Sequence, residues 1–209
     1  MRDYLAWHDA YDRPGSRLHL RLLVVQDLIA AALDDLPPGP VRFVSMCAGQ
    51  GRDVLTVARR HRRGGDLTGR LVELDSANAA AARAVIAAAG LTGIEVVEGD
   101  AGLSDAYLGA APADLVLACG VFGNIRDADI RRTARFMPAL CTPGAWVLWT
   151  RGPREDGVIE RIQGWFADAG FEPTALVVPE DTYFGVGACR FTGTTAPLAA
   201  GRRLFTFTR

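Results

Sequence analysis

The sequence contains no lysine, so its 23 basic residues are all arginines, and 24 acidic residues bring the formal net charge to −1. Affinity for a phosphate backbone comes largely from an excess of cations that neutralise it. The one basic cluster, residues 59–63, stands where a helix is expected to end, so contact with the helix dipole and solvation explain it. The charge balance therefore argues against nucleic acid as a partner.

Long apolar runs are also missing. No run reaches the roughly 18 residues that a membrane-spanning helix needs, and the opening residues, 1–4, contain no apolar signal core. We therefore expect a cytoplasmic protein without a membrane partner. The 209 residues are enough for one domain with a sizeable core.

Cysteine is scarce and shows no metal-binding pattern. The four cysteines are Cys47, Cys119, Cys141 and Cys189. They form no Cys-X-X-Cys pair, and no histidine lies at zinc-finger spacing. We expect reduced, mostly buried thiols and no metal.

Residues 1–39 are predicted to form an N-terminal helical lid on one compact domain, 40–209. Apolar residues recur at helical spacing between positions 18 and 33. Pro14-Gly15 divides the helical region into two pieces, and Ser16 is expected to cap the second piece.

Beyond residue 40, mostly apolar runs alternate with helix-compatible segments. The runs predict strands at 41–46, 70–74, 94–98, 113–119, 144–150, 172–178 and 203–208. The segments between them predict helices at 52–63, 77–89, 104–110, 127–140 and 156–169. This alternation is typical of a doubly wound α/β fold with helices on both faces of a mostly parallel sheet. Because no long helix separates the last two strands, we expect a seven-stranded sheet whose last strand is antiparallel.

The first predicted strand runs directly into a Gly-X-Gly turn, Gly49 to Gly51, and then into a helix-compatible segment. Glycine lets the chain turn sharply and lets a ligand approach the backbone closely. Open α/β sheets usually build a nucleotide-like pocket in this way. A nicotinamide dinucleotide is a less favoured occupant, because its fingerprint needs Gly or Ala where this chain has Val54.

With further motifs in the expected order, residues 40–209 resemble the class I S-adenosylmethionine-dependent methyltransferases, which have a Rossmann-like fold. The family's first motif is an acidic residue followed by Gly-X-Gly-X-Gly. Gly49 and Gly51 match the last two glycines, whereas Ser45 and Cys47 stand at the acidic and first glycine positions. The resemblance implies a set of cofactor-binding residues in this turn: Cys47, Ala48, Gly49, Gly51 and Asp53. Asp53 would partly replace the missing acid near the methionine end of the cofactor.

Two aspartates follow the next predicted strands. The resemblance implies that Asp75 accepts hydrogen bonds from both ribose hydroxyls of the cofactor, which suits a carboxylate; helix capping is its other interpretation. Glu73, two positions earlier, alternates to the other face and ranks lower. Asp100 is implied to meet the adenine amine, with the Ala101 backbone nearby, and an ordinary turn is the alternative.

A small-residue turn follows the strand predicted at 113–119. The resemblance implies that the Cys119 carbonyl and Gly120 border the methionine part of the cofactor, and it places Asn124 near the reacting methyl. Hydrogen bonding within the loop is the slightly favoured interpretation of Asn124. The segment lacks the Asn-Pro-Pro-Tyr type signature of enzymes that methylate adenine or glutamine, which argues against DNA adenine as the substrate.

Methyl transfer from a sulfonium is an in-line displacement, in which positioning can supply roughly 7–11 kcal/mol. A base is needed only when the nucleophile arrives protonated and weak. The candidate bases are His8 and Tyr11 in the lid, followed by His19; simple packing of the lid on the core is the alternative. Tyr183 and Phe184, in an insert expected between the last two strands (181–191), are candidate substrate contacts, with an ordinary loop as the alternative.

The short lid and compact core favour a small-molecule acceptor, with S-adenosylhomocysteine as the product. The altered first motif also leaves open a non-catalytic, S-adenosylmethionine-binding or regulatory subunit. An NAD(P)-dependent oxidoreductase is less favoured. The sequence indicates neither an oligomeric state nor the atom that is methylated.

Overall fold

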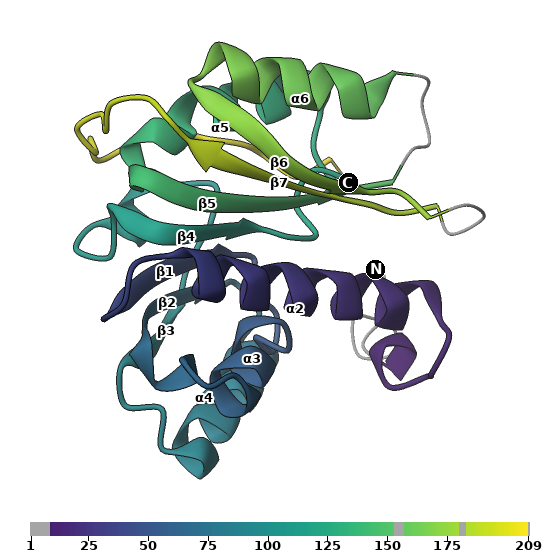
Figure 1. The fold of residues 1–209 in the computed structure, drawn as a ribbon, viewed down its shortest axis with the longest axis vertical. Helices are drawn as coiled ribbons and strands as arrows, with labels where there is room; N and C mark the ends of the chain where they lie inside the picture. The colour runs from purple at the N-terminus through teal and green to yellow at the C-terminus, as the bar shows by residue number, and fades with distance from the viewer. Residues whose placement is uncertain (1–8, 153–156, 180–182, 209) are drawn as a thin grey trace.

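The computed structural model describes residues 9–152, 157–179 and 183–208. At its centre is a seven-stranded sheet of order β3-β2-β1-β4-β5-β7-β6 (Figure 1). The strands are β1 (Val41–Met46), β2 (Leu67–Glu73), β3 (Ile94–Glu98), β4 (Ala113–Ala118), β5 (Cys141–Arg151), β6 (Phe171–Val177) and β7 (Gly185–Phe191). The first five strands are parallel, and β7 is antiparallel to its neighbours β5 and β6. The predicted doubly wound, mostly parallel sheet is confirmed.

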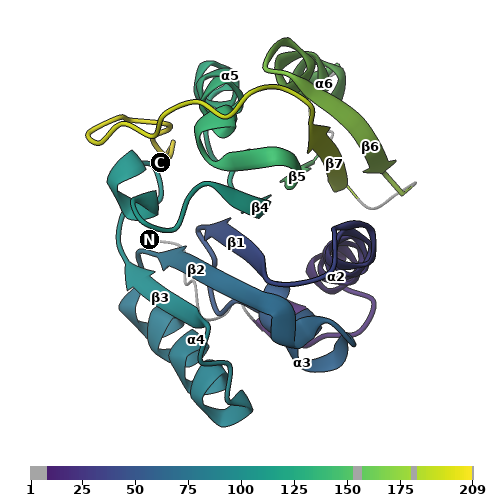
Figure 2. The same ribbon diagram turned by 60° about the vertical axis from the view of Figure 1, so that its left-hand side comes forward.

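Helices cover both faces of this sheet (Figures 1 and 2). One face carries α2 (Arg17–Asp35), α3 (Val54–Arg60) and α4 (Ser76–Ala89), and the other carries α5 (Asp127–Phe136) and α6 (Val158–Asp168). Each face has its own cluster of buried apolar residues. This double coverage explains why the central strands have apolar runs instead of alternating patterns. Within the described ranges, no helix combines the length and apolar character needed to cross a membrane.

Helix α2 begins where the sequence predicted. The Ser16 side chain caps it by accepting a hydrogen bond from the His19 backbone N–H at 3.1 Å. Val25, Ile29 and Leu33 are at most 2% exposed, so the apolar stripe of α2 packs on the sheet. The C-terminal end of α2 lies beside the middle of β5, where the Trp146 indole N–H donates to Asp35 at 3.0 Å. The N-terminal end reaches the edge where the parallel strands finish.

The last strand does not lie where the sequence predicted it. Residues 203–208 form no strand, and β7 instead occupies most of the segment that was expected to be an insert. β7 lies between β5 and β6 and is buried along nearly its whole length. Gly187 lies so close to Trp149 that a Cβ would overlap the indole ring. Packing in the sheet has overridden the low strand propensity of this glycine-rich segment.

The helix predicted at 104–110 is also wrong, because the segment forms only a 3₁₀ turn, Ser104–Tyr107. A C-terminal strap, residues 192–208, packs beside this turn, and the Leu204 N–H donates to the Gly102 carbonyl at 2.8 Å. Leu204 and Phe205 are at most 1% exposed and join the core cluster on the α5 side. The apolar pattern of 203–208 therefore belongs to a core plug. The helices predicted at 52–63 and 127–140 form, but α3 and α5 are shorter.

The strap predicts a position-specific loss of stability. Replacing Phe205 by alanine should lower the free energy of unfolding by about 3–5 kcal/mol, because it opens a cavity in the packed core. Phe207→Ala is the matched control, since that ring is 44% exposed, and its loss should stay below about 1 kcal/mol. Urea unfolding measures both variants. Equal losses at the two positions would contradict the plug.

Candidate functional site

The turn between β1 and α3 places Cys47, Gly49 and Gly51 in the left-handed region, with φ of 50°, 56° and 66°. Glycine adopts this conformation without steric penalty, whereas a residue with a Cβ pays roughly 1–2 kcal/mol. A Cβ on Gly51 would also come within 3.0 Å of the Leu55 and Leu71 side chains. Cys47 therefore keeps the backbone conformation expected of the glycine that the family motif has at this position.

Glu73 connects this turn to the end of β2. Its carboxylate accepts hydrogen bonds from the Gly49 N–H at 2.7 Å and from the Asp75 N–H at 2.9 Å, and the residue is only 8% exposed. The sequence predicts that Glu73 is a poorer candidate than Asp75 for binding the ribose, because strand side chains alternate between faces. Alternation does not extend to Asp75, because β2 ends at Glu73. One signal in the sequence could have identified Glu73. It is an acidic residue at the end of an apolar strand, two positions before the residue that caps the next helix.

Asp75 caps helix α4. Its Oδ1 accepts a hydrogen bond from the Asn78 N–H at 2.9 Å, and its side chain lies at the exposed start of the helix. Both carboxylates thus lie at the carboxyl end of β2, but in different surroundings. Glu73 is buried against the glycine turn, and Asp75 is exposed beside it.

Asp100 lies at the end of β3 and is held from two sides. Its Oδ1 accepts from the Gly102 N–H at 2.8 Å, and its Oδ2 forms an ion pair with Arg203 of the strap at 2.5 Å. Ala101 is buried, and its carbonyl accepts from the Tyr107 hydroxyl at 2.6 Å. A contact from the strap was not predicted here, because Arg203 lies 103 positions from Asp100 in the sequence.

The Cys47 thiol lies close enough to the Glu73 and Asp100 carboxylates to feel their charges. Burial raises its pKa, and the negative charges of Glu73 and Asp100 raise it further. The structure therefore brings together residues at the carboxyl ends of β1, β2 and β3. The Cys47 thiol stays protonated at neutral pH.

The loop after β4 is tied together by its own hydrogen bonds. The Gly120 N–H donates to the Thr150 hydroxyl at 2.7 Å, and the Asn124 side-chain amide donates to the Gly120 carbonyl at 2.7 Å. The Asn124 carbonyl accepts from the Thr208 N–H at 2.9 Å. Asn124 therefore makes the loop hydrogen bond that was its slightly favoured interpretation.

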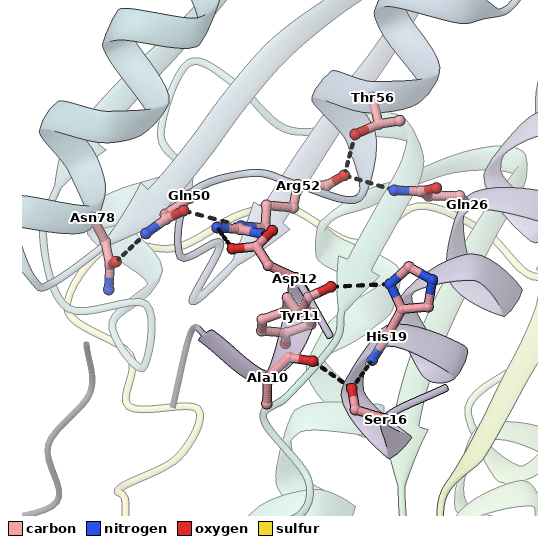
Figure 3. A network of polar contacts seen from close by, with 10 residues as sticks. All are labelled: Ala10, Tyr11, Asp12, Ser16, His19, Gln26, Gln50, Arg52, Thr56 and Asn78. Atoms are coloured by element: carbon pink, nitrogen blue, oxygen red, sulfur yellow. Dashed lines mark hydrogen bonds and ion pairs between the residues drawn. The ribbon is translucent and has the colours of Figure 1, made fainter. Parts of the chain in front are cut away.

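Arg52, in the glycine turn, joins the N-terminal segment to the site (Figure 3). Its guanidinium pairs with Asp12 at 2.5 Å, donates to the Gln50 side chain at 3.0 Å and lies over the Tyr11 ring. Its carbonyl accepts from the Gln26 amide of α2 at 2.9 Å. These contacts of Arg52 were not predicted from the sequence, because no motif connects position 52 to the N-terminal segment.

Tyr11 lies within the same group. Its hydroxyl accepts a hydrogen bond from the Arg21 guanidinium at 2.7 Å, and its carbonyl accepts from the His19 Nδ1 at 2.9 Å. Burial raises the pKa of the Tyr11 phenol, while the positive charge of Arg21 opposes that shift and Asp53 adds to it. Tyr11 is therefore protonated at neutral pH. His8, the other candidate base, lies outside the described residues.

Asp53 caps α3 and Cys119 follows β4, and the two side chains are close enough to interact electrostatically. Burial raises the pKa of the Asp53 carboxyl, whereas the hydrogen bond from the Val54 N–H and the charge of Arg21 lower it in part. Burial also raises the pKa of the Cys119 thiol, with Asp53 adding to the rise and Arg21 opposing it. Arg21 of α2 is thus within electrostatic reach of both residues.

The two aromatic candidates for substrate contact point in different directions. Phe184 is 5% exposed and belongs to the core cluster that includes α2. Tyr183 is 65% exposed, and the Arg17 guanidinium lies 5.4 Å from its ring centre. Only Tyr183 therefore reaches the surface beside the N-terminal end of α2.

A hollow of about 340 Å³ lies at the opposite edge of the sheet, with Arg42, Thr68 and Glu95 in its wall. None of the predicted cofactor residues lines it. In the parts of the chain that the structure describes, no group of three His, Cys, Asp or Glu side chains is arranged to hold a metal.

Solved structures share this architecture. An O-methyltransferase family protein from Burkholderia thailandensis matches at 20% identity and a TM-score of 0.68, covering 88% of this chain and 58% of that protein. Magnesium protoporphyrin IX methyltransferase from Synechocystis PCC 6803, with bound SAM, matches at 11% identity and a TM-score of 0.71, covering 90% and 91%. The [4+2]-cyclase SpnF matches at 16% identity and a TM-score of 0.60, covering 84% and 81%.

These identities establish the fold alone, and the cyclase shows that proteins of this fold carry out different reactions. The chain spans little more than half of the Burkholderia protein. No curated protein gives a match. A family model described as "Putative methyltransferase" matches residues 9–162. Because that match extends from the N-terminal segment into α6, the chain belongs to this methyltransferase family, with the Rossmann-like fold of S-adenosylmethionine-dependent enzymes.

Proposed function

We propose that this protein transfers a methyl group from S-adenosylmethionine to a small-molecule acceptor. The observation that carries the proposal is the left-handed turn after β1, whose Gly49 N–H is held by the buried Glu73 carboxylate. The turn lies where β1 has β2 on one side and β4 on the other. Open α/β sheets bind nucleotides at this switch point. The family match and the SAM-bound neighbour support the same cofactor.

The groups around the turn fit the chemistry of this cofactor. Glu73 and Asp75 supply carboxylate oxygens for ribose hydroxyls. Leu74, between them, is 71% exposed and offers an apolar surface for a purine ring. Asp53 carries the charge opposite to an ammonium group. When bound, the cofactor supplies a methyl already activated by its sulfonium, so the protein's main task is to bind and align the reactants.

We rank Glu73 above Asp75 as the ribose acceptor. Two backbone N–H groups orient the Glu73 carboxylate, and each of its oxygens keeps a second lone pair for a hydroxyl. One oxygen of Asp75 is already engaged in capping α4. A preoriented, buried acceptor loses less freedom on binding than an exposed one.

Glu73→Gln and Asp75→Ser separate these roles. We expect Glu73→Gln to weaken S-adenosylhomocysteine binding about tenfold or more, which corresponds to about 1.4 kcal/mol. Asp75→Ser keeps a good N-cap, so its stability should change by only a few tenths of a kcal/mol, and its affinity should fall about threefold or less. Calorimetry measures affinity and thermal unfolding checks the fold. A larger loss of affinity in Asp75→Ser than in Glu73→Gln would reverse the ranking.

The raised pKa of Asp53 predicts that this residue lowers stability at neutral pH while it contributes to cofactor binding. Burial raises that pKa above its usual value of 3.8, so the stability that Asp53 contributes is present below 3.8 and is lost as pH rises through the raised value. Asp53→Asn should therefore be more stable than wild type at pH 7 and similar to it in strong acid, yet bind S-adenosylhomocysteine more weakly. Urea unfolding at both pH values and calorimetry test this. A variant less stable than wild type at pH 7 would contradict it.

For the transfer step we propose alignment more than base catalysis. Tyr11 is protonated, and the amide of Asn124 is already bonded to its own loop. Their proposed roles are to hold the lid and the β4 loop around the reacting groups. Tyr183, exposed beside Arg17, is the proposed acceptor contact, and His8 stays the proposed base for acceptors that arrive protonated.

Turnover tests the function directly. With methyl-labelled S-adenosylmethionine and a panel of small-molecule acceptors, we expect label in a product together with S-adenosylhomocysteine. Cofactor binding without transfer to any acceptor would favour the non-catalytic subunit. Binding of NAD in place of S-adenosylmethionine would contradict the cofactor assignment.

A further inference from the structure

Arg21 is a partly buried cation beside the candidate site, connected to it through Tyr11, whose ring lies under Arg52 of the glycine turn. It lies on α2, is partly buried, and donates to the hydroxyl of Tyr11 at 2.7 Å. Among the described residues, no carboxylate comes within ion-pair distance of its guanidinium. By contrast, the neighbouring Arg52 pairs with Asp12 at 2.5 Å. Partial burial of a guanidinium is unfavourable unless an anion or several acceptors compensate for the lost water. Arg21 therefore has capacity for an anionic ligand.

The surroundings of Arg21 indicate which anion. Its charge acts on Asp53, which follows the glycine turn, and on Cys119, which follows β4. The resemblance to the methyltransferase family assigns both residues to the methionine end of the cofactor. That end is a zwitterion, with one carboxylate and one ammonium group. Arg21 and Asp53 present the complementary charges and are close enough to interact without forming a direct ion pair with each other.

Resting on the function proposed above, we infer that Arg21 binds the carboxylate of the methionine end, while Asp53 faces its ammonium group. The Tyr11 hydroxyl is a positioning group that orients the guanidinium through its hydrogen bond. Ser45 is buried in β1 at the position where the family has its acid, so it supplies no charge there. The charged contact with the amino acid part has thereby moved to the helix that covers the turn.

Two ligands that differ only in the carboxylate test this inference. They are S-adenosylhomocysteine and its decarboxylated analogue, each titrated by calorimetry into wild type, Arg21→Met and Arg17→Met. Arg21→Met should weaken S-adenosylhomocysteine about tenfold or more, and should leave the affinity for the decarboxylated analogue within about twofold of wild type. Arg17 is the matched control, because it lies one turn earlier on α2 and contacts Tyr183. Its variant should bind both ligands like wild type.

Two further variants separate binding from folding. Arg21→Lys keeps the charge and should recover part of the preference for the carboxylate. Tyr11→Phe should reduce that preference by a few-fold, with little change for the decarboxylated analogue. Unchanged thermal unfolding of the Arg21 variants would show that the lid remains packed.

Three results would overturn the inference. Equal weakening of both ligands in Arg21→Met would make Arg21 a packing residue of the lid. Unchanged binding of both, with a raised KM for an acceptor, would assign Arg21 to an anionic acceptor. If wild type bound neither ligand, the proposed function itself would fail, which is a separate result from loss of discrimination in the variant alone.

Discussion

The site depends on one buried carboxylate. Glu73 accepts hydrogen bonds from Gly49, in the turn after β1, and from Asp75, at the start of α4. Both N–H groups belong to irregular backbone that no sheet or helix hydrogen bond satisfies, and a buried unpaired N–H costs about 1–3 kcal/mol. This side chain therefore ties the turn to β2, together with the Ala48 N–H, which donates to the Val72 carbonyl at 2.9 Å. It also connects the turn to Asp75, whose side chain caps α4.

The sequence predicted the parallel half of the fold well because its strands are continuous apolar runs bounded by turns. The antiparallel end was harder. β7 contains glycine, alanine and cysteine, and its small residues make sense only under the Trp149 ring of β5. The strap shows the converse error. Phe205 and Leu204 gave an apolar pattern typical of a strand, yet they fill a core left open by a short 3₁₀ turn. Both outcomes depend on partners distant in the sequence.

The site residues also divide into those that could be predicted from the sequence and those that depend on distant partners. Gly49 and Gly51 could be identified from the sequence because both have positive φ, a conformation that strongly favours glycine. The relative standing of Glu73 and Asp75 depended on where β2 ends, and strand ends are the least predictable feature of a sequence. Arg52 and Arg21 belong to no motif. Their importance comes from α2, which folds back over the turn.

Ser45 and Cys47 both depart from the family's first motif, and the two departures have different consequences for the site. Cys47 adopts the backbone angle of a glycine, so the shape of the turn is preserved at the expense of some strain. The charge lost at Ser45 is a different matter, because a buried serine cannot attract an ammonium group as a carboxylate does. Asp53 restores a negative charge nearby, but burial disfavours its ionised form. A positive neighbour such as Arg21 offsets part of that penalty. The two charges are therefore interdependent: in the proposed site, Arg21 of α2 offsets part of the cost of ionising Asp53.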